Sequence, residues 1–174
     1  MKIPVNPTVC AKLPMATGVG LIAGLAGTIV MTACQRLDMK ITGRSKNTAP
    51  ADAVREVLDI KPVTGSESHQ LSAWVHWVYG TSLGLVRGLV HLLGIRGLKA
   101  GVAHFGVVWG TELIMLPRLR VAPPLSRESP GTIARDALYH DLYTGSAGLV
   151  FDAVMEEAQA GQVREHFIIQ SKKN

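Results

Sequence analysis

The feature that most constrains this chain is a stretch of 18 residues without a charged side chain, which runs from Thr17 to Cys34 (TGVGLIAGLAGTIVMTAC). As a helix it would be about 27 Å long, close to the roughly 30 Å thickness of the hydrocarbon core of a bilayer. Three later segments are almost as poor in charge: 71–95 contains only Arg87, 100–117 only Glu112 and 137–151 only Asp141. We therefore expect lipid to be the solvent for most of the 174-residue chain.

A soluble helical bundle is the alternative, and it predicts a polar stripe along each helix. The only polar side chains of the first segment are three threonines. Gly20, Gly24 and Gly27 follow one another at i, i+4 and i+7 and share one helix face. Glycine weakens a soluble helix by about 1 kcal/mol, but in a membrane it lets helix backbones approach closely. The pattern favours a membrane span whose glycine face packs either inside the protomer or between two copies in a homodimer.

We predict an all-α fold, a polytopic membrane four-helix bundle that occupies residues 1–174 as a single domain. The expected spans are about 17–35, 71–95, 99–117 and 133–155, the last being the least apolar. Within the connection 36–70, apolar and charged residues fall on opposite faces of 51–60 (ADAVREVLDI), and a proline at 50 suits a first helical turn. This predicts a short amphipathic helix over about 50–60, either on the membrane surface or packed against the end of the bundle.

The charged residues and the cysteines indicate how the chain is oriented in a membrane and which kinds of partner it lacks. Basic residues number ten on the connections that follow the first and third spans and seven outside the spans on the other side, which favours cytoplasmic long connections. The net charge of +5 does not indicate nucleic acid, because the basic residues are scattered and aromatics make up only 5%. Two cysteines are too few for a disulfide framework. A second interpretation of the N-terminal run, which ends at Cys34, is a processed lipoprotein leader.

An internal repeat divides the chain into two similar halves. His76-x-x-Tyr79 in the second span is matched by His140-x-x-Tyr143 in the fourth, and a glycine follows each histidine by eight residues. The first and third spans share a Gly-Thr pair followed by a methionine. Two helices per unit return the chain to the same side, so we expect two parallel copies about an axis along the membrane normal. This arrangement predicts that the two histidines lie at similar depth.

Ionisable residues inside a span are costly and are candidate functional residues for that reason. Each repeated histidine shares a helix face with a tyrosine three residues later, which suits proton relay. Glu112 needs a partner, for which His76, His140 and Arg87 are candidates. The predicted polar cluster is His76, Tyr79, His104, Glu112, His140, Asp141 and Tyr143. The alternative role of these residues is to hold the helices together through structural hydrogen bonds.

Metal binding and cofactor binding are not predicted. Histidine and carboxylates are ligands for zinc or iron, but we identified no pair with His-x-x-x-His or Glu-x-x-His spacing. His104 and Glu112 are about two helical turns apart, too far to share one ion directly. Phosphate-binding loops, nucleophile elbows and dinucleotide fingerprints are also missing from the sequence.

Five motifs together resemble the YagU-type family of bacterial inner-membrane proteins. They are the glycine-rich run 20–28, Thr42-Gly43-Arg44 followed by Pro50, His76-x-x-Tyr79-Gly80, Trp109-Gly110-Thr111-Glu112 with Pro117, and His140-x-x-Tyr143. The resemblance covers about residues 18–152. It implies a small multi-pass protein of the bacterial inner (cytoplasmic) membrane, and it carries no catalytic assignment. Thr144 stands where the first copy has Gly80, so the second motif departs from the first.

Two functions fit these features. In the first, the protein handles protons, ions or a small solute through an intramembrane His/Glu/Tyr cluster. In the second, it is a non-catalytic scaffold or accessory subunit that binds another membrane protein or a second copy of itself. A metal-dependent membrane enzyme is less favoured than either. A solute-handling protein should have a cavity between its helices, whereas a scaffold should be packed dry there.

Overall fold

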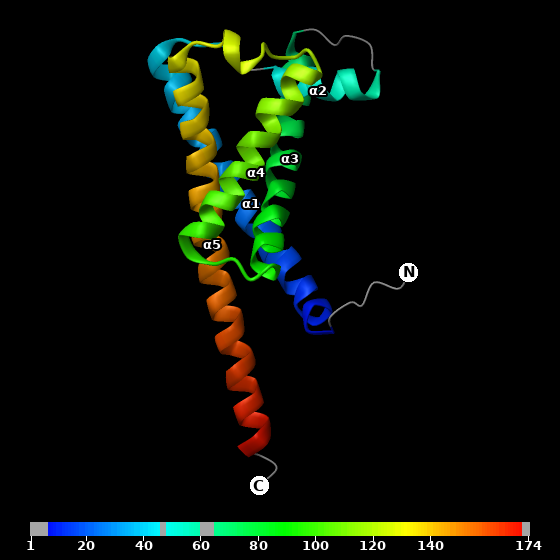
Figure 1. The fold of residues 1–174 in the computed structure, drawn as a ribbon, viewed down its shortest axis with the longest axis vertical. Coiled ribbons are helices and arrows are strands. Elements are labelled where there is room, and N and C mark those ends of the chain that lie inside the picture. Colours follow the sequence, from blue (N-terminus) through cyan, green and yellow to red (C-terminus); the bar gives the residue numbers. More distant parts are fainter. Residues whose placement is uncertain (1–6, 46–47, 60–64, 172–174) are drawn as a thin grey trace.

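The computed structural model of the chain describes residues 7–45, 48–59 and 65–171, which form helices without any strand (Figure 1). The elements are α1 (Pro7–Thr42), α2 (Ala49–Leu58), α3 (Ser66–Leu92), α4 (Gly97–Arg118), the 3-10 helix η1 (Leu125–Arg127) and α5 (Pro130–Ser171). The all-α prediction is confirmed over these residues.

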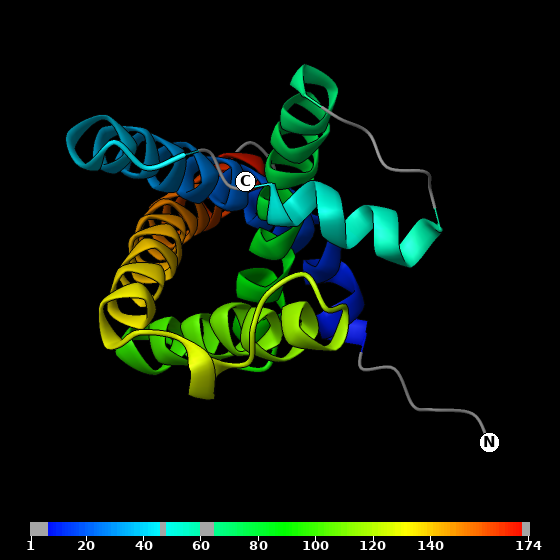
Figure 2. The ribbon, with the colours of Figure 1, turned by 90° about the horizontal axis from the view of Figure 1, so that it is seen from above.

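The four long helices α1, α3, α4 and α5 surround a common centre when the molecule is seen from above (Figure 2). In Figure 1, α2 and the α4–α5 connection lie at one end of the bundle, and the short α3–α4 turn lies at the other. The lower part of α5 extends beyond the rest of the bundle. Each pair of long helices, α1 with α3 and α4 with α5, therefore begins and ends on the same side (Figure 1).

Local sequence accounts for the ends of the long helices. Gly94 adopts a φ of +80° and donates its backbone N–H to the carbonyl of His91, 3.0 Å away, which ends α3. This left-handed conformation is readily available to glycine. At the start of α5, the Ser129 hydroxyl accepts the Thr132 backbone N–H at 3.1 Å, and Pro130 occupies the first turn.

The glycine face of α1 is used inside the protomer. A Cβ added at Gly20 would lie 2.8 Å from the carbonyl oxygen of Gly84, and one at Gly24 would lie 2.2 Å from that of Thr81. Gly27 lies against the ring of Tyr143 in α5. Because α3 and α5 already cover this face, the suggested use of the three glycines as a homodimer contact is wrong for this fold.

The interior contains small and polar residues, while large apolar residues lie outside. The largest fully buried side chains are Arg87, Phe151, His104 and Thr28. Large apolar residues are exposed on every long helix, including Ile22 on α1, Trp74 and Leu89 on α3, Leu98 on α4 and Leu149 on α5. Among the described residues, two helical stretches, Lys12–Thr42 and Gly97–Arg118, are long and apolar enough to cross a membrane, and most residues of the apolar 18-residue window in each lie on the surface.

Two expected elements differ in detail from the observed ones. Helix α2 buries Ala51, a member of the predicted apolar face, but leaves Val57 and Leu58 of that face exposed, so only part of the face is covered. Position 60, the expected end of that helix, lies outside the described residues. Helix α5 continues past the predicted limit of 155 to Ser171. The predicted limit was the end of the apolar segment, and the helix itself extends beyond it into a polar one.

Candidate functional site

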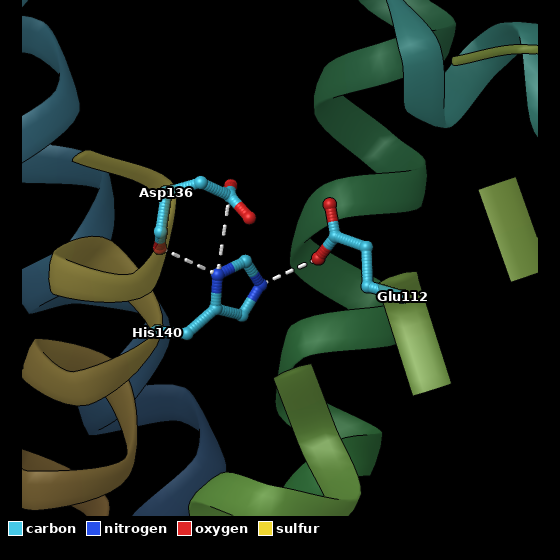
Figure 3. Close-up of side chains that lie close together, drawn as sticks. All are labelled: Glu112, Asp136 and His140. Carbon is cyan, nitrogen blue, oxygen red and sulfur yellow. Dashed lines mark hydrogen bonds and ion pairs between the residues drawn. The ribbon is translucent and has the colours of Figure 1, made fainter. Parts of the chain in front are cut away.

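The centre of the site is an ion pair between α4 and α5. Oε2 of Glu112 lies 2.5 Å from Nε2 of His140, and the two side chains point toward each other in Figure 3. The His140 imidazole is almost completely buried, while the Glu112 side chain is 29% exposed. Of the three partners considered for Glu112, the structure therefore selects His140.

Asp136, one helical turn before His140, completes the group. The Nδ1 atom of His140 lies 2.9 Å from the Asp136 backbone carbonyl oxygen and 3.7 Å from its carboxylate (Figure 3). Because a carbonyl only accepts, Nδ1 carries the proton in this hydrogen bond. The indole N–H of Trp109, on α4, donates to the Asp136 carboxylate at 2.8 Å. Thus α4 contributes to the site both the carboxylate of Glu112 and the group that orients Asp136.

The first repeat has a corresponding but weaker contact. Nε2 of His76, on α3, lies 3.0 Å from the hydroxyl of Thr32, on α1. In both halves the histidine of the second long helix therefore uses Nε2 to bond to a side chain of the first long helix. The partner is a neutral hydroxyl in one half and a carboxylate in the other.

Both histidines line the same cavity of about 380 Å³ between the helices. Its described lining includes six titratable side chains: His76, Tyr79, Glu112, Asp136, His140 and Tyr143. None of the described residues that line it is a lysine or arginine. A second cavity of about 980 Å³ shares the walls formed by His76, Glu112 and Asp136 and extends among residues of the two long connections. The two spaces thus meet at the carboxylates of the site.

The two tyrosines of the repeat differ in their environment. Tyr143 is buried, and its hydroxyl donates to the Gly80 carbonyl oxygen at 2.6 Å, which ties α5 to α3. Tyr79 is 38% exposed. Among the described residues, the Tyr143 hydroxyl thus forms a bond between helices, whereas Tyr79 is partly exposed.

Two predicted members lie outside the cavity lining. His104 is fully buried, with Nε2 3.3 Å from the Leu83 carbonyl oxygen and its ring packed against Tyr143. Asp141 is exposed on α5, although it directly follows His140. A step of one residue rotates a side chain by about 100° around the helix, which carries Asp141 away from the site.

Sequence reasoning missed Asp136, Trp109 and Thr32 as parts of the site. Asp136 was recognisable, since it precedes His140 by four residues and so shares its helix face. The prediction that no metal binds overlooked this spacing. The indole and the threonine carried no comparable signal, because their contacts cross between helices.

Comparison of the chain with known protein families, curated proteins and solved structures finds no match. The resemblance to the YagU-type family stays a prediction.

Proposed function

We propose that this chain is a four-span membrane protein, built from two similar hairpins, that admits an ion or small polar solute into a hydrated cavity between its helices. Its placement in the bacterial inner membrane follows from the resemblance to the YagU-type family. The observation that carries the proposal is the convergence of six titratable side chains on one cavity of about 380 Å³.

The distribution of apolar side chains supports a membrane environment. Trp74, Leu98 and Leu149, on three different helices, are 72%, 84% and 76% exposed. Contiguous apolar patches on soluble monomers rarely exceed a few hundred Å², whereas here every long helix exposes large apolar side chains. Lipid is the solvent that accepts such a surface without penalty.

Inward-facing charges explain why α3 and α5 have lower hydropathy than α1 and α4. Arg87 in α3 is 1% exposed and forms an ion pair with Asp152 of α5. Asp136 and His140 of α5 face the cavity. Arg87, Asp136 and His140 reduce the mean hydropathy of their helices from positions inside the bundle, so both helices remain suitable spans.

The cavity supports solute handling rather than a purely structural role. Ligand sites in helical bundles combine a mainly apolar wall with a few convergent polar groups. Here the polar groups come from α3, α4 and α5, and the neighbouring larger cavity provides a route from the end with the long connections.

Cysteine accessibility tests both parts of this proposal. In protein lacking Cys10 and Cys34 and reconstituted in lipid nanodiscs, Leu83→Cys places a thiol on the cavity wall, and Leu85→Cys places one on the exposed outer surface. The two positions are about 3 Å apart along the helix axis, which makes them a matched pair. We expect a charged, water-soluble thiol reagent to modify Leu83→Cys and to leave Leu85→Cys unmodified.

The other outcomes reject the proposal in different ways. Rapid modification of Leu85→Cys would show that the outer surface faces water and not lipid. No modification at either position would show a dry interior, as expected of a scaffold.

Asp141 indicates where a membrane partner would bind. Its side chain is exposed in the middle of the expected fourth span. A carboxylate facing lipid is unfavourable, so a second copy or another membrane protein would supply its partner. We expect Asp141→Leu to alter the oligomeric mass measured in detergent, and an unchanged mass would exclude a homodimer through this residue.

A further inference from the structure

The strongest unassigned chemistry in the molecule is the donor set of Glu112, Asp136 and His140. One ligand atom from each residue lies within 4.8 Å of the atoms from the other two. Bonds of about 2.0–2.2 Å from one ion to three such atoms place the ligands roughly 3–4 Å apart. The Glu112 and His140 atoms, 2.5 Å apart, are closer than an ion would hold them, so side-chain rotations that bring all three atoms to about 3–4 Å from one another would complete the site.

The orientation of His140 suits a metal ligand. Its Nδ1–H donates to the Asp136 backbone carbonyl at 2.9 Å, which leaves Nε2 facing the Glu112 carboxylate. Histidines that bind metals usually donate their second nitrogen to a carbonyl or carboxylate in this way. At 2.5 Å this contact requires a proton between Nε2 and the carboxylate oxygen, and a metal ion would replace that proton with the two atoms about 3–4 Å apart.

The charge of the cavity also favours a cation. Glu112 and Asp136 contribute two carboxylates to the cavity of about 380 Å³, and none of its described lining residues is a lysine or arginine. The larger cavity that shares these carboxylates is lined by basic side chains as well as acidic ones, so the preference for a cation applies to the smaller cavity. Arg135, the cation next in sequence to Asp136, is instead 3.6 Å from Asp38. Both carboxylates are partly exposed, with side-chain exposures of 29% and 38%, so an ion has access to them from the cavity.

We propose that Glu112, Asp136 and His140 bind a divalent first-row transition-metal ion of the zinc, iron and manganese class. This inference rests on the proposed function and gives the class of ion that the cavity admits. One imidazole nitrogen with two carboxylate oxygens suits these metals, whereas magnesium and calcium prefer oxygen ligands alone. Three protein ligands leave coordination positions open toward the cavity.

Zinc binding to the purified full-length protein in detergent tests the site. After metal removal, zinc is titrated in competition with a chromophoric chelator, and the bound metal is counted by elemental analysis. We expect one Zn²⁺ per chain, at least 100-fold weaker binding in Glu112→Gln and His140→Gln, and at least tenfold weaker binding in Asp136→Asn. Glu157→Gln is the matched control, because it removes an exposed carboxylate of the same helix that lies outside both cavity linings, and it should bind zinc like the parent protein.

A spectroscopic measurement on the protein without substitutions tests the site even if the variants fail to fold. Bound Co²⁺ should give the weak visible bands of nitrogen and oxygen coordination, without a thiolate charge-transfer band. A thiolate charge-transfer band would show that the ion binds a cysteine and would overturn the assignment. Absence of zinc binding, or binding unchanged in both Glu112→Gln and His140→Gln, would also overturn it.

The metal test and the cavity test fail separately. If Leu83→Cys is modified but no metal binds, the hydrated cavity stands and its occupant is not a transition metal. If metal binds but Leu83→Cys is protected, the site exists without the proposed solute cavity.

Discussion

Gly24 of α1 and Gly84 of α3 meet backbone to backbone: a Cβ added at Gly84 would lie 2.7 Å from the Cα of Gly24. Even an alanine requires the two helices to separate here. We expect Gly84→Ala to destabilise the protein by about 1–3 kcal/mol, measured as a lower Tm in detergent. Gly106→Ala, on an exposed position with nothing within 4 Å, is the control and should be neutral or gain up to about 1 kcal/mol. Equal effects at the two sites would contradict the close packing.

The buried guanidinium of Arg87 depends on one carboxylate. It forms an ion pair with Asp152 and lies 4.8 Å from the centroid of the Phe151 ring. Two of its nitrogens, Nε and Nη1, have no hydrogen-bond partner among the described residues. Because Asp152→Asn leaves the cation without its counter-charge, we expect a loss of about 2–3 kcal/mol in unfolding free energy.

A double-mutant cycle isolates that interaction. Asp152→Asn should cost much less in an Arg87→Met background, because the buried charge is then already gone. Glu157→Gln, which changes an exposed carboxylate on the same helix, should change stability little. Additive effects of the Arg87 and Asp152 substitutions would show that the pair is not coupled.

The hydroxyl of Tyr143 makes the α5–α3 bond described above. Tyr143→Phe removes only that hydroxyl and should destabilise the bundle by about 0.5–1.5 kcal/mol in denaturant unfolding, because the Gly80 carbonyl loses a donor. Tyr79→Phe is the matched variant from the other repeat and should have a smaller effect, since Tyr79 is partly exposed. The opposite ranking would argue against the asymmetry of the two halves.

Trp109 orients one carboxylate of the proposed metal site. Trp109→Phe removes the indole N–H that Asp136 accepts and should weaken zinc binding about tenfold, as is typical for groups that orient metal ligands. The exposed Trp74 is the control, and Trp74→Phe should bind zinc normally. Chelator competition measures the zinc dissociation constants of both variants. Equal zinc affinity of Trp109→Phe and the parent protein would show that Trp109 does not orient the metal ligand.

The sequence by itself determined the local features of this protein. Charge-free segments and their lengths predicted helices, because helical hydrogen bonds form within a segment and need no distant partner. The spacing of Gly20, Gly24 and Gly27 predicted a close-packing face for a similar reason, since three positions on one helix share a face whatever lies opposite.

Only the tertiary structure decided which side chains meet. Glu112 had three candidate partners, and the packing of α4 against α5 selected His140. The same packing added Asp136 and left Asp141 and His104 outside the cavity lining. The rotation of each helix about its own axis settles these outcomes. That rotation depends on how neighbouring helices fit together, and an error of about 100° exchanges a residue of the site for one on the surface.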